Sequence, residues 1–279
     1  MKWQGRRGSR NIEDRRHAKR GKAGSIGGLG LIAILVIGYL LGVDVTPLLQ
    51  DTGGGFATEQ SAEITPADEK AAQFVSVTLA DTEEVWADIF AEQVGRRYNP
   101  PTLVLFKGST QSACGGASAS TGPFYCPPER KAYLDTSFFA TLDRQLGARG
   151  DFAAAYVIAH EVAHHVQNEL GILGKVEQAR RQSSQTEANA LTVRLELQAD
   201  CLSGVWARSV EGLLEPGDME EALNAARMIG DDRLQKRAGR VPQPHTFTHG
   251  TSAQRARWFT KGFQSGDINV CDTFGARTL

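Results

Sequence analysis

The sequence predicts an α+β domain, a small sheet followed by helices, behind one N-terminal transmembrane helix. Three observations predict this class: an uncharged apolar run over residues 25–43, two short apolar strands within residues 101–135, and helical periodicity over most of the remaining chain. The 279 residues, 41% of them hydrophobic, are enough to bury a sizeable core. This composition excludes a disordered chain.

The N-terminal residues have the pattern of a membrane anchor. Residues 1–22 hold nine Lys or Arg against two acidic residues, whereas the whole chain has a net charge of -1. The uncharged run over residues 25–43 approaches the roughly 20 residues that cross a bilayer as a helix. We therefore expect a basic cytoplasmic head at residues 1–24 and a single-pass helix at 25–43 in the inner (plasma) membrane. Everything after Val43 would lie on the periplasmic or extracytoplasmic side.

Two other interpretations of this segment are weaker. A cleaved signal peptide has a shorter apolar run, and no small-residue cleavage site follows here. Nucleic-acid binding by the basic residues is not needed, because an anchor already explains them. We expect a membrane partner and no nucleic acid, and the sequence leaves the oligomeric state open.

The four cysteines fit a compartment that permits disulfides. Their even number allows two bridges, with three possible pairings. Cys114 and Cys126 bracket a turn-rich loop that could close on itself, which favours Cys114–Cys126 and leaves Cys201–Cys271. Cysteine ligation of a metal is the weaker alternative, since the chain has no CxxC pair.

The elements of the domain follow in order. Residues 44–68, with three consecutive glycines, predict a flexible linker, and residues 69–279 form the domain. A helical apolar face ending on glycine predicts a helix over 82–95, and strands are predicted at 101–106 and 131–135. Either strand could be the sheet edge to which an extended substrate pairs.

The second half of the domain is predicted to be helical. A helix is expected over residues 137–146, and Asp151 is expected to cap the helix that follows. A long polar helix over 178–211, another starting near Pro216 and a final one over 252–262 complete the chain.

The stretch YVIAHEVAHHVQNELG, residues 156–171, carries the chemistry. His160 and His164 are four residues apart, so a helix presents both imidazoles on one face, where they can hold one metal ion. Glu161 lies beside them as a general base that takes a proton from an activated water. A histidine-rich core helix is the alternative, but buried polar groups without partners are costly. His165 points about 100° away from His164 and is expected to be packed or exposed rather than to bind metal.

A catalytic zinc site needs a third protein ligand. The apolar helix containing LELQADC offers Glu196, and Asp200 lies one turn further on. Asp200 could then accept a hydrogen bond from a ligand histidine and fix its tautomer. Asp200 itself, Glu187 or a late histidine are the alternative ligands.

The reaction also needs a hydrogen-bond donor for the oxyanion of the tetrahedral intermediate. The segment HTFTHGTSAQR supplies His245, His249 and Arg255, and His249 is our first candidate for this catalytic role. Tyr125 and Tyr133 are weaker candidates. A purely local structural role for His249 is an equally open alternative.

Six blocks of the sequence carry a resemblance to a known family. They are GPFYCP, AYLD, HEVAHHVQ, LELQADC, FTHGTSAQRARWF and CDTF, and the opening MKWQGRRGSRNIEDRR adds to them. In this order they resemble the YpfJ-type family of neutral zinc metallopeptidases, which is placed among gluzincin-type zincins. The resemblance implies a zincin-like fold with an active-site helix and a glutamate helix. It also implies His160, His164 and Glu196 as zinc ligands, Glu161 as general base and Asp200 as their supporting acceptor.

These observations predict a membrane-anchored zinc metallopeptidase that hydrolyses peptide bonds of a peptide or protein substrate. One alternative is a zinc hydrolase acting on a non-peptide amide of the cell envelope, because the chemistry requires only a carbonyl. Another is a non-catalytic envelope scaffold stabilised by zinc, although a structural zinc site has no use for Glu161. The physiological substrate and its cleavage preference do not follow from the sequence.

Overall fold

The computed structural model describes residues 1–17, 63–118, 121–144, 147 and 149–279. Within these ranges, residues 1–16 and 65–279 form one compact unit. The predicted transmembrane helix at 25–43 and most of the predicted linker lie outside the described residues. In the part that is described, no helix is both long and apolar enough to span a bilayer. The unit combines a small sheet with helices, which confirms the α+β prediction.

The main sheet has four strands in the order β1-β2-β6-β5. Strand β1 (Ile12–Asp14) runs parallel to β2 (Thr102–Phe106), and β2 runs parallel to β6 (Lys131–Asp135). Strand β5 (Phe124–Cys126) is antiparallel to β6. A separate hairpin pairs β3 (Ser109–Ser112) with β4 (Gly115–Ser118).

The two predicted strands are present as β2 and β6, but neither is an edge of the sheet. Both lie in its centre, so the prediction that one of them pairs with substrate was wrong. The edges are β1 and β5, each three residues long. A run this short shows no alternation in the sequence, which is why both were missed.

The first sixteen residues do not form a separate head, and this corrects the predicted domain division. Strand β1 extends the sheet, with Ile12 opposite Leu103. Met1 and Trp3 are buried, and the Trp3 ring meets the edge of Phe74 at 5.4 Å between ring centroids. Several backbone hydrogen bonds join this segment to the rest of the domain. They could not form if a membrane lay between the two.

The positive charge of this segment is neutralised by the domain. Arg6 pairs with Asp81 and Arg7 with Glu84, both on α3 (Pro66–Ile89). Glu13 pairs in turn with Lys131 of β6, at 2.7 Å. These ion pairs hold the described part of the basic segment against the domain.

Helix α3 begins earlier than predicted. Its first turn is fixed by a capping box in which Thr65 and Asp68 exchange hydrogen bonds, with Pro66 as the first helical residue. The predicted linker therefore ends before Thr65. Helix α3 continues into a short π-helical turn (Phe90–Val94) that ends at Gly95, where φ is +73°.

The remaining helices follow the prediction with three corrections. The N-cap of α5 (Asp151–Glu169) is Gly150 and not Asp151 as predicted. Asp151 is the first residue of the helix, and no side chain caps the helix start. The long polar helix is divided at Ser184, whose capping box with Glu187 starts a new helix. A short helix near residue 234 was not predicted. The set is α4 (Phe138–Arg144), α5, α6 (Ile172–Arg181), α7 (Gln185–Ser209), α8 (Asp218–Met228), α9 (Asp231–Arg237) and α10 (Ser252–Ser265).

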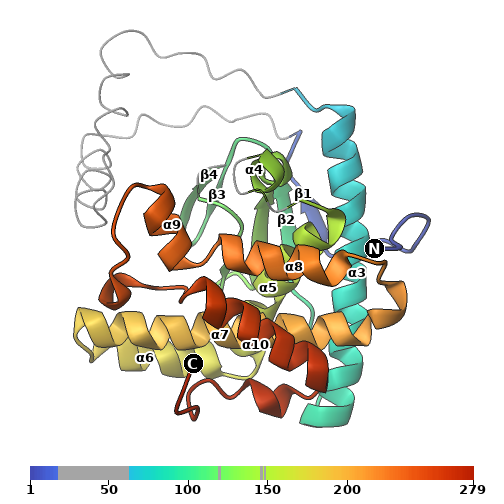
Figure 1. Ribbon diagram of the computed structural model, residues 1–279. Coiled ribbons are helices and arrows are strands. Elements are labelled where there is room, and N and C mark those ends of the chain that lie inside the picture. Colours follow the sequence, from blue (N-terminus) through green and yellow to red (C-terminus); the bar gives the residue numbers. More distant parts are fainter. Residues whose placement is uncertain (18–62, 119–120, 145–146, 148) are drawn as a thin grey trace, which may run out of the picture. The chain divides into compact units, whose positions relative to one another are not determined.

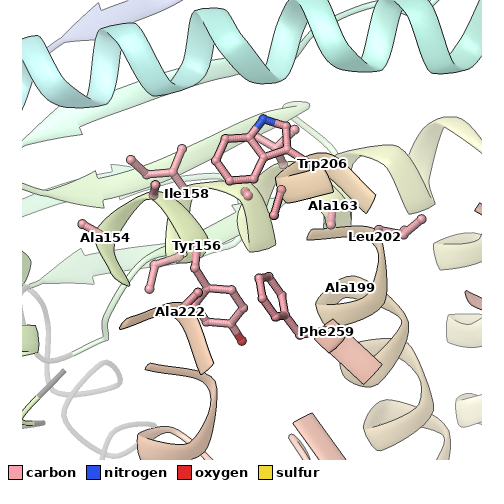
Figure 2. Packing of buried hydrophobic residues seen from close by; sticks show 14 of the residues in the cluster. Ala154, Tyr156, Ile158, Ala163, Ala199, Leu202, Trp206, Ala222 and Phe259 are labelled. Carbon is pink, nitrogen blue, oxygen red and sulfur yellow. The ribbon is translucent and has the colours of Figure 1, made fainter. Parts of the chain in front are cut away.

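The core forms where α5, α7, α8 and α10 pack together (Figures 1 and 2). Tyr156 meets the edge of Phe259 at 5.3 Å, and Trp206 stacks on Phe152 at 5.9 Å. Helices α7 and α10 approach most closely at two glycines. A Cβ on Gly204 would lie 2.0 Å from the carbonyl oxygen of Phe259, and one on Gly262 would lie 1.9 Å from that of Cys201.

Both predicted disulfides are confirmed. Cys114–Cys126 joins the β3–β4 hairpin to β5, and Cys201–Cys271 joins α7 to the C-terminal segment. The second bridge holds the segment that follows α10 against α7.

Candidate metal centre

Helix α5 presents the two histidines of the HExxH sequence on one buried face. His160 and His164 are one turn apart, with ring centroids separated by 4.8 Å. The Nδ1 atom of each ring has an acceptor: His160 lies 3.0 Å from Asp200, and His164 lies 2.9 Å from the Gln167 side chain. An Nδ1–H that donates in this way leaves the Nε2 of each neutral ring as a free lone pair.

Both Nε2 atoms face Glu196 of α7. The carboxylate of Glu196 lies 3.0 Å from Nε2 of His160 and 3.4 Å from Nε2 of His164. One ligand atom from each residue fits within 4.8 Å of the other two. Two imidazole lone pairs and a carboxylate repel each other unless a cation lies among them. The arrangement therefore fits zinc bound by two histidines and one glutamate.

The second carboxylate of α7, Asp200, is fully buried and has several donors. It accepts from Nδ1 of His160, from the hydroxyl of Tyr156 at 2.5 Å, and from the guanidinium of Arg255 at 2.8 and 2.9 Å. Arg255, on α10, is also fully buried. Asp200 thus orients the imidazole of His160, and Tyr156 and Arg255 hold Asp200 in place.

The electrostatics of the site favour a positive charge between the histidines and Glu196. Burial alone would lower the pKa of His160, but its hydrogen bonds with Asp200 and Glu196 raise that pKa to about 9. Burial would raise the pKa of Glu196, yet the neighbouring histidines hold it well below its usual range. The pKa of Asp200 is also lowered, because Arg255 and His160 outweigh its burial.

Glu161 lines the same cleft as His160, His164 and Glu196. Burial raises the pKa of its carboxyl group. Across the described residues, no hydrogen bond or ion pair engages this carboxylate. Glu161 is therefore available to exchange a proton with a molecule in the cleft.

The cleft above the centre has a volume of about 670 Å³. Its walls come from β5 and the residues before it, from α4 and α6, and from the loop that precedes α10. Apolar side chains on either side of the metal centre include Phe124, Phe138, Leu173, Leu195, Ile229 and Leu234. Such a cleft is suited to an extended chain with apolar side chains.

His249 lines this cleft and is held by Asp231, the first residue of α9. One carboxylate oxygen of Asp231 accepts the backbone N–H groups of Thr248, His249 and Gly250. The other lies 3.2 Å from Nδ1 of the His249 ring. The sequence reasoning missed Asp231, and the only available signal was an acidic residue at the start of an unpredicted helix.

The structure excludes the alternative candidates from the centre. Glu187 closes the capping box of α7, and His245 lies outside the residues that line the cleft. Tyr133 donates its hydroxyl to Glu129. Tyr125 lines the cleft, but its hydroxyl hydrogen-bonds to His165, which is fully buried and lies outside the group formed by His160, His164 and Glu196.

Gln167 was not assigned a role from the sequence, and the role of Arg255 differs from the predicted one. Gln167 lies three residues after His164, a spacing that places both on one helix face and could have suggested the contact. Arg255 was expected in the loop with His249 as a possible oxyanion donor. It lies instead inside α10 and pairs with Asp200, a contact across 55 residues that no local pattern signals.

Comparison with known proteins places the chain among related sequences. The family model described as "Putative neutral zinc metallopeptidase" matches residues 1–274. The uncharacterized protein YpfJ of Escherichia coli is 50% identical over 291 aligned positions, which cover 99% of both chains. Uncharacterized proteins of Mycobacterium bovis and Mycobacterium tuberculosis are each 46% identical over 195 residues, or 65% of both chains. No solved structure matches the chain.

Proposed function

The chain belongs to this family of neutral zinc metallopeptidases, whose cofactor is zinc, and from that premise we propose that it hydrolyses peptide bonds at the centre formed by His160, His164 and Glu196. The convergence of two Nε2 atoms on one partly buried carboxylate carries the proposal. Zinc bound there supplies a Lewis acid that polarises the scissile carbonyl and acidifies the attacking water.

The chain's own residues would divide the remaining work. Glu161 takes the proton of the attacking water and later delivers it to the leaving amine. His249 donates a hydrogen bond to the developing oxyanion from Nε2. Nδ1 of the same ring lies 3.1 Å from the Thr248 hydroxyl and 3.2 Å from the Asp231 carboxylate, and these contacts orient the ring.

The substrate would bind as an extended peptide along β5. This strand lines the cleft and pairs only on its β6 side within the described sheet. Main-chain pairing with β5 would align the peptide, and apolar side chains would enter the cleft on either side of the metal centre. A non-peptide amide of the cell envelope remains the second candidate, because the centre itself contacts only a carbonyl.

Zinc analysis of the purified full-length chain tests the proposal first. We expect one zinc per chain in the wild type and in Glu161→Gln, and loss of zinc in Glu196→Ala. Glu161→Gln should hydrolyse peptides about 10²–10⁴-fold more slowly. Wild-type protein that stays folded but binds no zinc after loading would refute the proposed function. Retained biological activity in Glu161→Gln would favour the scaffold alternative.

Attachment to the inner membrane through residues 25–43 stays a prediction, but a single crossing of the bilayer and the docking of the N-terminal segment on the domain exclude each other. A strand cannot pair across a bilayer, so residues 1–16 and 65–279 would have to share one side of the membrane. The two disulfides favour an oxidising compartment for both. We therefore propose that the N-terminal segment lies with the domain on the extracytoplasmic side, so that residues 25–43 would attach to the membrane without crossing it as a single span.

A further inference from the structure

The third histidine of α5, His165, is fully buried on the side of the helix that faces away from the metal centre. Its Nε2 lies 2.7 Å from the carbonyl oxygen of Asn99, and its Nδ1 lies 2.9 Å from the hydroxyl of Tyr125. A carbonyl oxygen can only accept, so Nε2 carries the proton. In the neutral ring, Nδ1 then accepts the hydrogen bond from Tyr125.

The Tyr125 hydroxyl is held by α5 at two points. It donates to His165 and accepts from the Asn168 side chain, which lies 3.0 Å away. The Tyr125 ring also meets the edge of the His165 ring, with centroids 5.4 Å apart, and Tyr98 contacts the same ring from the loop that carries Asn99. Helix α5 therefore holds the side chain of Tyr125, in β5, through hydrogen bonds and ring contacts.

Strand β5 itself has few other fixed contacts with α5, and the ion pair of Arg130 with Glu169 joins α5 to the β5–β6 turn rather than to the strand. It is three residues long, and within the described sheet it pairs on one side only. Its last residue, Cys126, is tied to Cys114 of the hairpin rather than to a helix. Yet Phe124 and Tyr125 form one wall of the cleft, opposite the metal-binding face of α5.

We infer that His165, acting through the Tyr125 hydroxyl, is a positioning residue that sets the separation between β5 and the metal-binding face of α5. The inference rests on the proposed peptidase function and identifies extended peptides as the substrates affected. A peptide paired with β5 presents its carbonyl to the metal centre only if that separation is kept. A substrate too short to pair with β5 does not depend on it.

Tyr125→Phe in the zinc-loaded full-length chain tests this inference, because it removes one hydroxyl and keeps the ring. Tyr133→Phe, in the neighbouring strand β6, is the matched control. It also removes one hydroxyl, which donates to Glu129 at 2.6 Å. We expect normal zinc content in both. In Tyr125→Phe, KM for an oligopeptide should rise about tenfold, the effect of one lost hydrogen bond, while kcat should stay within about twofold. Cleavage of a dipeptide should not change.

Two substitutions of His165 refine the test. His165→Leu removes both hydrogen bonds and should raise KM at least as much as Tyr125→Phe. His165→Gln keeps a donor and an acceptor at similar reach and should recover part of that loss. A role in general packing alone would not separate KM from kcat in this way.

Several outcomes would overturn the inference. A fall in kcat at unchanged KM in Tyr125→Phe would assign the hydroxyl to the chemistry instead. Equal effects of Tyr125→Phe and Tyr133→Phe would leave no special role for the contact with His165. If the zinc-loaded wild type cleaves no peptide, the proposed function fails. Amide hydrogen exchange in β5 then decides whether the Tyr125 hydroxyl positions the strand. Faster exchange in Tyr125→Phe than in Tyr133→Phe supports positioning, whereas equal exchange contradicts it.

Discussion

Arg255 donates two hydrogen bonds to Asp200, from Nε at 2.8 Å and from Nη2 at 2.9 Å, although the two residues lie on different helices. Both are fully buried. Through this pair α10 contributes to the metal centre without supplying a ligand, because Asp200 in turn orients His160. The packing of the C-terminal helix and the geometry of the centre are therefore coupled.

Arg255→Met should destabilise the protein by about 3–5 kcal/mol, because it leaves the Asp200 charge buried without its partner. Zinc affinity should fall as well, since Asp200 no longer has a fixed position beside His160. Denaturant titration and zinc competition measure the two effects. Arg257→Met, an exposed position on the same helix, is the control and should change neither.

Adding Asp200→Asn to Arg255→Met should recover part of the lost stability but not the zinc affinity. The double variant no longer buries an unpaired charge, yet it still lacks a carboxylate beside His160. Losses that simply add in the double variant would contradict the coupling of the two residues.

His249→Ala should lower kcat about 10²–10³-fold with a small change in KM, as expected for a donor that acts on the oxyanion. Asp231→Asn should lower kcat in the same direction, because it weakens the contact that orients the ring. Steady-state kinetics on the zinc-loaded enzyme measure both. His245→Ala, at an exposed residue outside the cleft, is the control. Normal turnover with impaired binding in His249→Ala would argue against the oxyanion role.

The stability of the fold should decrease in acid partly through Asp68. Burial alone would raise the pKa of Asp68, but hydrogen bonds from Lys107, Thr65 and Thr136 outweigh it and hold the pKa well below its usual range. In the window between the folded pKa and the unfolded value of about 3.9, the unfolded chain binds more protons. The contribution of Asp68 is therefore complete above that window and is lost as pH falls through it.

Denaturant titrations at several pH values can isolate this contribution. Asp68→Asn should be less stable than the wild type at neutral pH, and the difference should shrink below about pH 4. Asp88→Asn, on the exposed side of the same helix, is the control. A difference that stays constant over the whole range would show that Asp68 acts without its charge.

The location of the N-terminal segment can be tested with single cysteines in the full-length chain. Arg10→Cys lies at an exposed position of this segment, and Val241→Cys lies in the domain at 81% exposure. Both should react equally with a membrane-impermeant maleimide in intact cells, because β1 and β2 belong to one sheet. Permeabilised cells give the reference for full labelling. Labelling of Val241→Cys alone would mean that the segment is not docked in the cell.

The sequence by itself determined the parts of this protein that depend on local spacing. The four-residue interval of His160 and His164, and of Glu196 and Asp200, required only the period of a helix. The apolar strands at β2 and β6 and the bracketed loop at Cys114–Cys126 were equally local. These patterns offered His160, His164 and Glu196 as candidate ligands, and the structure brings the three side chains together.

Tertiary structure alone decided the contacts made between distant segments. Arg255 reaches Asp200 across 55 residues, and β1 joins the sheet far from its partner β2 in the chain. The basic N-terminus resembled a topological signal because its acidic partners, Asp81 and Glu84, are distant in sequence. A local pattern indicates which side chains share a face of a helix or strand. The element that packs on that face is fixed only in the whole fold, where every buried charge needs an opposite charge and every buried strand edge needs a hydrogen-bond partner.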